Sequence, residues 1–324
     1  MQILYGYRNL EKKLKDPIIA IGIFDGIHLG HKRVIKKLLS FREPAREKVV
    51  VTFDPHPQTI LRPGKRPPRI MSLDHRLFIL EKMGLDAVIV IRFTDSVAMM
   101  SPEEFVKKVI KSIGARKVYV GNNFHFGKGK SGNVEKFKEI GRECGIDVQI
   151  VQPVKKGGKV VSSTWLRKLI KEGKIARAEQ LLRRPVSVLG TVVKGDELGK
   201  TLGNPTANID PHQEVIPPSG VYAVKVDISG KLYDGVLNRG FKPTFYGTKL
   251  KKRKEPRIEV HVIGYEGDLY GQNIEIFFIK RLRKEKHFKT REALIRQIKR
   301  DILKAKDVLS SKKILWKIKR YKYL

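Results

Sequence analysis

Apolar positions in the first half of the chain alternate between short continuous runs and runs with helical spacing. The continuous runs predict buried parallel strands over 17–24, 48–53, 87–93, 117–120 and 148–151. Helical spacing predicts a helix from residue 32 onward and others over 102–113, 134–144 and 163–182, and Ser101 is the expected N-cap of the second. Because strands and helices alternate, we predict an α/β domain, an open Rossmann-like parallel sheet with flanking helices.

The pattern changes near residue 185, where Arg183-Arg184-Pro185 follows the last of these helices and ends the helical spacing. Short alternating strands separated by Gly, Pro and Asn turns follow, over 186–193, 220–227, 231–237, 257–263 and 273–280. Such evenly spaced strands predict a small antiparallel β-barrel. Thr290 is expected to cap a terminal helix, and the apolar stripe of that helix consists of Leu294, Ile295, Ile298, Ile302 and Leu303. The predicted domains therefore span 1–184 and 185–324.

The length of 324 residues also favours two domains, and 41% hydrophobic residues supply a core for each. No run approaches the roughly 18 uninterrupted apolar residues that a membrane helix needs, and the N-terminus has no apolar core of signal-peptide type. Cys144 is the only cysteine, so the chain cannot form an internal disulfide. These features predict a cytoplasmic protein without membrane association.

The net charge of +35 raises the question of a nucleic-acid partner. Nucleic-acid binders usually concentrate basic residues on one face or tail, whereas here they are spread over both halves and interleaved with acids. Only the tail 312–323 mixes aromatic residues with lysines. The distribution favours a highly charged surface with sites for anionic phosphate substrates over dedicated nucleic-acid binding, which stays the alternative. The sequence gives no indication of the oligomeric state.

The clearest chemical signal is the segment 22–31, Gly-Ile-Phe-Asp-Gly-Ile-His-Leu-Gly-His. A strand, a turn bracketed by Gly22 and Gly26, and a helix start would present backbone N–H groups to a phosphate, and the glycines permit close approach. His28 and His31 are three residues apart, so both can project from one side of the first helical turn and neutralise charge on a phosphoryl group. The alternative is that the pair caps a helix or binds a metal.

This segment resembles the signature of the HxGH nucleotidyltransferase superfamily, whose members transfer an adenylyl or cytidylyl group from a nucleoside triphosphate and release pyrophosphate. The chain has no dinucleotide-binding fingerprint and no Gly-x4-Gly-Lys-Ser/Thr motif, which argues against an NAD dehydrogenase and a P-loop NTPase.

Three further motifs follow in order: Val-Thr-Phe-Asp-Pro-His-Pro at 51–57, Gly-Asn-Asn-Phe-His-Phe-Gly-Lys-Gly-Lys-Ser-Gly-Asn at 121–133, and Val-Ser-Ser-Thr-Trp-Leu-Arg at 161–167. Each alone is also a plausible turn or helix cap. Hydroxyl, amide and guanidinium groups at the start of the last helix would grip phosphates. The four ordered motifs resemble the N-terminal module of the bacterial bifunctional riboflavin kinase/FMN adenylyltransferases.

Two segments of the second half carry candidate chemistry. In the Gly-rich stretch 190–208, Thr206 and Asn208 are two apart and face the same way if extended, so their oxygens can help hold Mg²⁺; a plain Gly/Pro turn is the alternative. In 257–262 the apolar positions alternate with Glu259, which should therefore project away from the core. A solvent-facing strand residue is its default interpretation.

The segment 257–262 also resembles the riboflavin kinase strand whose glutamate orients the ribityl 5′-hydroxyl and accepts its proton. With landmarks at 217–223, 235–245, 267–271 and 280–286, the resemblance covers essentially the whole chain. It implies two reactions, riboflavin plus ATP to FMN in the barrel and FMN plus ATP to FAD and pyrophosphate in the α/β domain. A nucleotidyltransferase acting on another acceptor is the competing enzyme hypothesis.

The resemblance also implies roles for individual residues. The catalytic candidates are His28, His31, Arg167 and Glu259. ATP and its phosphates are expected at Gly22, Phe24, Asp25, Gly26, Ser162, Ser163 and Thr164 in one site, and at Gly199, Lys200 and Gly203 in the other. The flavin-binding candidates are Asp54, Asn123 and Phe126, and the Mg²⁺ candidates are Thr206 and Asn208.

The chain departs from the family pattern at five positions. Asn123 and Asn133 stand where Asp is frequent, which puts a charge-dependent role there in doubt, and Lys200 stands where Arg is usual. Asn204 and Arg239 replace residues that are more often apolar.

Overall fold

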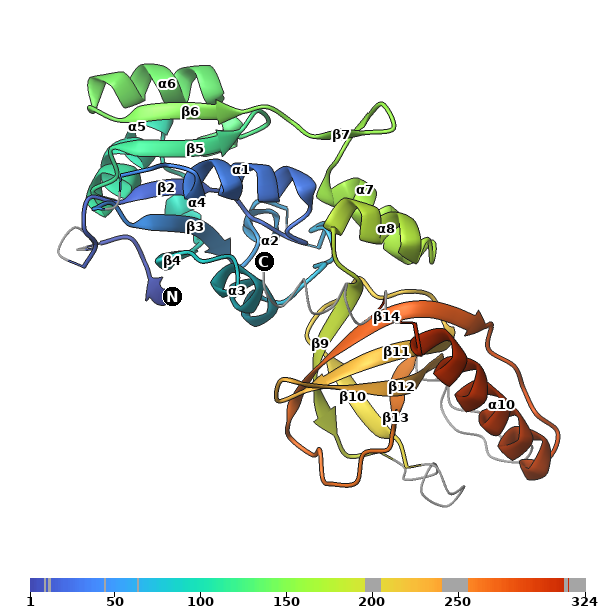
Figure 1. The fold of residues 1–324 in the computed structure, drawn as a ribbon. Helices are drawn as coiled ribbons and strands as arrows, with labels where there is room; N and C mark the ends of the chain where they lie inside the picture. Colours follow the sequence, from blue (N-terminus) through green and yellow to red (C-terminus); the bar gives the residue numbers. More distant parts are fainter. Residues whose placement is uncertain are drawn as a thin grey trace. The chain divides into compact units, whose positions relative to one another are not determined.

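A computed structural model describes residues 1–8, 10, 13–43, 45–62, 64–195, 205–240, 256–311 and 314. The chain divides into two compact units (Figure 1). The first consists of Met1–Pro68 with Leu73–Ser163, and the second of Arg69–Ser72 with the chain from Thr164 onward. The domain boundary between residues 184 and 185 stays a prediction.

The first unit is built on a parallel sheet with the strand order β1-β4-β3-β2-β5-β6. Its strands are β1 Gln2–Tyr5, β2 Ile18–Ile21, β3 Lys48–Asp54, β4 Ala87–Arg92, β5 Lys117–Gly121 and β6 Asp147–Val151. The predicted α/β class is confirmed. From β2 the chain moves to one side of the sheet for β3 and β4, and then to the other side for β5 and β6. The carboxyl ends of β2 and β5 therefore flank the switch point where such sheets bind ligands.

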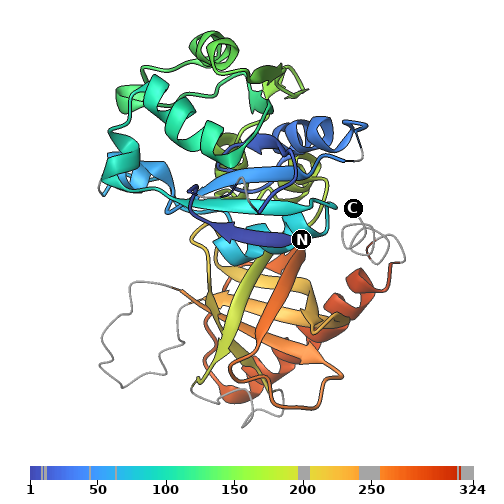
Figure 2. The same cartoon turned by 90° about the vertical axis from the view of Figure 1, so that its left-hand side faces the viewer.

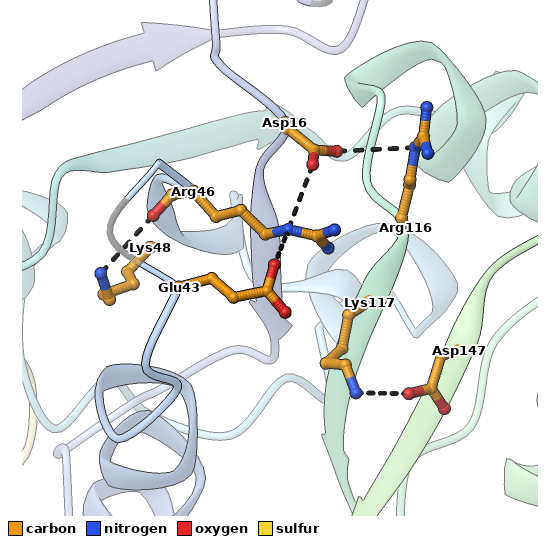
Figure 3. Close-up of polar contacts among 7 residues, drawn as sticks. All are labelled: Asp16, Glu43, Arg46, Lys48, Arg116, Lys117 and Asp147. Atoms are coloured by element: carbon orange, nitrogen blue, oxygen red, sulfur yellow. Dashed lines mark hydrogen bonds and ion pairs between the residues drawn. The ribbon is translucent and has the colours of Figure 1, made fainter.

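The amino ends of the same strands carry a network of ion pairs (Figure 3). Arg46 Nε contacts the carboxylates of Glu43 at 2.5 Å and Asp16 at 3.1 Å, and at the next strands Lys117 Nζ lies 2.5 Å from Asp147. These acidic side chains therefore pair with neighbouring basic side chains at the amino ends of the strands, the end of the sheet opposite the switch point.

The helices of the first unit include α1 Leu29–Leu39, α2 Pro57–Leu61, α3 Leu73–Glu81, α4 Asp95–Ala98, α5 Pro102–Phe105 and α6 Val134–Glu143. Ser101 caps α5 in a reciprocal capping box with Glu104, as predicted. The helix predicted over 102–113 is confirmed, but its second part is not α-helical. There α5 continues as a π-helical segment, Val106–Ile110, and a 3₁₀ turn, Lys111–Ile113, whose apolar side chains are buried, so tertiary packing overrides the regular pattern.

The single helix predicted over 163–182 is two helices, α7 Ser163–Lys171 and α8 Ile175–Leu182. Gly173 adopts φ +71°, a left-handed conformation that ends a helix, and its N–H donates to Ile170 O. A hairpin of β7 Lys155–Lys156 and β8 Lys159–Val160 precedes them and was not predicted. Its turn is Gly157-Gly158, both at positive φ.

The second unit contains a closed barrel with the strand order β10-β13-β12-β11-β14-β9 (Figure 2). Its strands are β9 Val186–Val193, β10 Ala207–Pro211, β11 Gly220–Ile228, β12 Lys231–Gly240, β13 Arg257–Ile263 and β14 Asn273–Arg283. The predicted antiparallel barrel is confirmed. β10 was not predicted, because it lies directly after a stretch of glycines that indicates a loop.

The terminal helix α10 spans Arg291–Leu309, and Thr290 Oγ1 accepts from Ala293 N as the expected cap. The predicted apolar stripe is not its most buried face, since Leu303 is 66% exposed and the buried residues are Asp301, Ala305 and Leu309. An ion pair explains why the charged Asp301 is buried. Arg283 donates to the buried Asp301 carboxylate from Nε at 2.9 Å and from Nη2 at 2.8 Å. Among the helices of the described ranges, none is long and apolar enough to cross a membrane.

Replacing Asp301 with alanine should destabilise the second unit by about 3–5 kcal/mol, because the half-buried Arg283 guanidinium loses its counter-charge. Urea unfolding, followed through the far-UV circular dichroism, measures the effect. Asp307→Ala is the matched control, since Asp307 is exposed on the same helix and should be nearly neutral. Equal stability of the two variants would contradict the assigned role of the ion pair.

Candidate functional site

The turn between β2 and α1 is an unusually constrained piece of backbone. β2 ends at Ile21, earlier than predicted, and Phe24 and Ile27 have φ of 53° and 40°, values that side-chain-bearing residues rarely adopt. Both residues are almost completely buried, and Ile27 N donates to Phe24 O at 3.1 Å. Such strained backbone persists only where the surroundings hold it in place, as happens frequently at functional sites.

His28 is the N-cap of α1. Its Nδ1 accepts hydrogen bonds from Gly30 N at 3.2 Å and His31 N at 3.4 Å, and the residue is buried. The helix-capping alternative is therefore correct as local structure, and it also has a chemical consequence. Because the Nδ1 lone pair faces backbone N–H groups, a neutral His28 ring carries its proton on Nε2, which leaves Nε2–H as a donor.

The second histidine stacks on the first. The rings of His28 and His31 are 3.7 Å apart at 16°, and the edge of Phe24 meets His31 at 5.4 Å. A Cβ at Gly30 would come to 3.0 Å from the His28 ring, a tight contact that glycine avoids. The structure thus brings together Phe24, His28 and His31.

A hydrogen bond connects the motif at 161–167 to the same turn. Ser163 Oγ donates to the carbonyl of the buried Asp25 at 2.9 Å. Ser162 precedes this contact, and Gly22 and Gly26 border the turn. Thr164 and Arg167 lie on α7 in the second compact unit, and their contact with a triphosphate stays a prediction.

Two of the three flavin candidates lie in the loop after β5. Asn123 is exposed there, whereas Phe126 is 7% exposed and packs on Phe105 and Phe137 in the core of the first unit. Asn133, a departure from the family pattern, caps α6 by accepting from Lys136 N at 2.9 Å. Asn and Asp are equally good caps, so this substitution preserves the local structure.

Sequence reasoning missed one buried residue beside the turn, Arg76 on α3. Its Nη1 donates to Ile23 O at 2.5 Å, and its Nη2 lies 3.4 Å from Phe53 O and 3.7 Å from the third flavin candidate, Asp54. No pattern in the sequence indicates this role, because a lone arginine in a helix is normally a surface residue.

In the barrel, the candidate carboxylate occupies the predicted face of β13. Ile258, Val260 and Val262 are buried, and Glu259 projects to the other side. Strand register pairs Glu259 with Asn208 on β10 and with Asn238 on β12. Directly paired residues of antiparallel strands share a face, so these three side chains form a row. Asn238 was not predicted, because its strand was expected to end one residue earlier.

Two further contacts shape this row. His261 Nδ1 lies 2.8 Å from Pro205 O, which holds the residue before Thr206 beside β13. Gly195 lies against the Asn208 amide so closely that any Cβ there would overlap it. Gly199, Lys200, Gly203 and Asn204 lie outside the described residues. Together with the hydroxyl of Thr206, the row nevertheless offers amide and carboxylate oxygens, a donor set that suits Mg²⁺. No group of three or more His, Cys, Asp or Glu side chains suited to a metal occurs in the described ranges.

If the barrel forms FMN, as its sequence resemblance implies, replacing Gly195 with alanine should lower that rate at least tenfold, because the added Cβ displaces the Asn208 side chain. The steady-state rate with riboflavin and ATP measures it. FAD formation from supplied FMN, which the same resemblance assigns to the first unit, is the internal control and should be unchanged. An unaltered kinase rate would mean that the position of Asn208 is unimportant.

The segment 217–219 is held by three side chains of the barrel. Arg239 Nη1 donates to Pro217 O at 2.5 Å, the Tyr222 hydroxyl donates to Pro218 O at 2.5 Å, and Arg281 donates to Ser219 O. Burial raises the pKa of the Tyr222 phenol, which keeps it a donor. The unusual Arg239 therefore has a structural role that an apolar residue could not fill.

A family model described as FAD synthetase matches residues 10–165, and one described as riboflavin kinase matches residues 182–309. A curated bifunctional riboflavin kinase/FMN adenylyltransferase of Escherichia coli K12 is 34% identical over 95% of this chain and 97% of its own length. The chain belongs to this bifunctional family. The Bacillus subtilis member is 32% identical over 93% of this chain and 95% of its own length.

A solved structure is similar to this chain in fold. The crystal structure of a protein named as a macrolide-efflux protein of Streptococcus pneumoniae has a TM-score of 0.78 and 28% sequence identity, over 93% of this chain and 97% of that chain. The likeness to it therefore extends over both units.

Proposed function

We propose that the chain makes FAD from riboflavin in two ATP-dependent steps. Riboflavin and ATP give FMN and ADP in the barrel domain, 185–324, and FMN and ATP give FAD and pyrophosphate in the α/β domain, 1–184. The observation that supports the proposal most strongly is the stacked pair His28 and His31 at the end of the strained turn after β2. Such a pair suits adenylyl transfer, and the row around Glu259 suits the kinase step.

In adenylyl transfer, an oxygen of the FMN phosphate attacks the α-phosphorus of ATP, and the bond to the bridging oxygen of pyrophosphate breaks. His28 Nε2–H and the His31 ring would donate to the non-bridging oxygens, where negative charge grows. The turn from Gly22 to Gly26 with Ser162, Ser163, Thr164 and Arg167 would bind the triphosphate. Asp54, Asn123 and Phe126 would bind the flavin.

In the kinase step, the ribityl 5′-hydroxyl attacks the γ-phosphorus and ADP leaves. Glu259 would align this hydroxyl and accept its proton late, because a carboxylate is too weak a base to ionise an alcohol beforehand. Thr206 and Asn208 would hold Mg²⁺, which supplies charge neutralisation for the phosphates, and Gly199, Lys200 and Gly203 would bind ATP.

The direct test incubates the chain with riboflavin, ATP and Mg²⁺ and separates the flavins. FMN should appear first and FAD after it, and a chelator should stop both. Absence of both flavins contradicts the proposal, and formation of FMN without FAD contradicts its adenylyl-transfer step.

We also propose that the protein is cytoplasmic and that its partners are small molecules. Salt-sensitive binding of generic nucleic acid without flavin products would favour the nucleic-acid alternative instead.

A further inference from the structure

Arg76 is a charged side chain buried beneath the active-site turn. It is the fourth residue of α3 and is 6% exposed. Arginine is rarely buried to this degree, because desolvating its charge is costly unless strong hydrogen bonds compensate. Leu77, Ile79 and Leu80 already supply buried apolar surface on this helix. Packing alone therefore does not explain an arginine here.

The hydrogen-bond and ion-pair partners of Arg76 lie at the carboxyl ends of two strands, β2 and β3. Nη1 donates to the Ile23 carbonyl at 2.5 Å, which lies in the turn after β2. Nη2 points to Phe53 O at 3.4 Å and Asp54 Oδ1 at 3.7 Å, at the end of β3. The planar guanidinium thus spans both loops with adjacent nitrogens, which a single ammonium group cannot do.

The Ile23 carbonyl is fixed twice, since Thr52 Oγ1 also donates to it at 3.2 Å. Ile23 is followed by Phe24, where the backbone enters its left-handed conformation, and the turn leads through Ile27 into His28. An anchored carbonyl directly before strained backbone restricts where the turn can relax. Arg76 and Thr52 therefore hold the start of the turn in its observed conformation.

We propose that Arg76 is a positioning residue for adenylyl transfer. It locks the turn that carries the ATP-binding groups and ties that turn to Asp54, so that the triphosphate and flavin sides of the site keep a fixed separation. It acts through the backbone, not by touching a substrate. This inference rests on the proposed function of the first unit.

The test compares Arg76→Met and Arg76→Lys with the parent chain, using FMN and varied ATP. For Arg76→Met, the KM for ATP in FAD formation should rise about tenfold with a fall in kcat, because a relaxed turn binds and orients the phosphates poorly. Arg76→Lys keeps one charged donor for Ile23 O and should be intermediate. FMN formation from riboflavin should stay unchanged in both.

A purely structural role would give a different result. Loss of folded first unit lowers the active fraction, so kcat falls while the KM for ATP stays constant; a KM for ATP within twofold of the parent in Arg76→Met overturns the proposal. If that variant does not fold, Thr52→Val replaces it, with about a threefold rise in KM expected and no change counting against the proposal. A parent chain that forms no FAD refutes the proposed function itself.

Discussion

Replacing His31 with alanine should lower FAD formation by about 100- to 1000-fold while FMN formation stays near the parent rate. His31 stacks on His28 at 3.7 Å but is not itself the helix cap, so its removal deletes a phosphate donor with little effect on α1. The measurement follows both flavins from riboflavin and ATP, and FMN should accumulate. Loss of both activities with the fold intact would contradict separate sites for the two steps.

The other histidine needs a different substitution, because alanine at position 28 would also remove the helix cap. His28→Asn is the matched variant, since an asparagine oxygen can accept from Gly30 N and His31 N as the imidazole Nδ1 does. It should retain the thermal stability of the parent and still lose FAD formation to a similar degree as His31→Ala. Full activity of this variant would assign His28 a capping role alone.

Replacing Glu259 with alanine should have the opposite outcome, with FMN formation reduced by about 100- to 10,000-fold and FAD formation from supplied FMN unchanged. In the proposed kinase step this carboxylate aligns and deprotonates the ribityl hydroxyl, and strand pairing puts Glu259 opposite Asn208. Riboflavin turnover with ATP measures the effect. Glu266→Gln is a suitable control, because Glu266 is an exposed carboxylate of the same unit and should be neutral. Unchanged kinase activity in Glu259→Ala would remove this residue from the mechanism.

The sequence predicted the strands of the first unit where apolar residues are continuous, and failed where they are not. All four residues of β2 are buried, so its pattern is unambiguous. In β1 only Leu4 is buried, because an edge strand leaves most side chains exposed, and the strand was missed. In α3 the polar residues His75 and Arg76 are buried among apolar ones, so helical spacing of apolar residues does not reveal its inner face.

The candidate sites show the same limit. Alternation along one strand predicted the orientation of Glu259, since side-chain direction is a local property with period two. The neighbours of Glu259 could not be predicted from local sequence, because Asn208 and Asn238 lie beside it only through the pairing of strands that are far apart in sequence. From the sequence, helix capping and catalysis are alternative roles for His28, yet the geometry allows both at once, since capping occupies only one ring nitrogen.

If the row of Asn208, Glu259 and Asn238 forms the proposed kinase site, kinase activity depends on the correct pairing of β13. A slip of one residue in the pairing of β13 would turn Glu259 into the core and put Ile258 or Val260 outside. The burial of those two apolar side chains therefore favours the strand register in which Glu259 lies on the outer face beside Asn208 and Asn238. Slowly exchanging amide hydrogens along β13 should accordingly identify the fraction of purified molecules that can phosphorylate riboflavin.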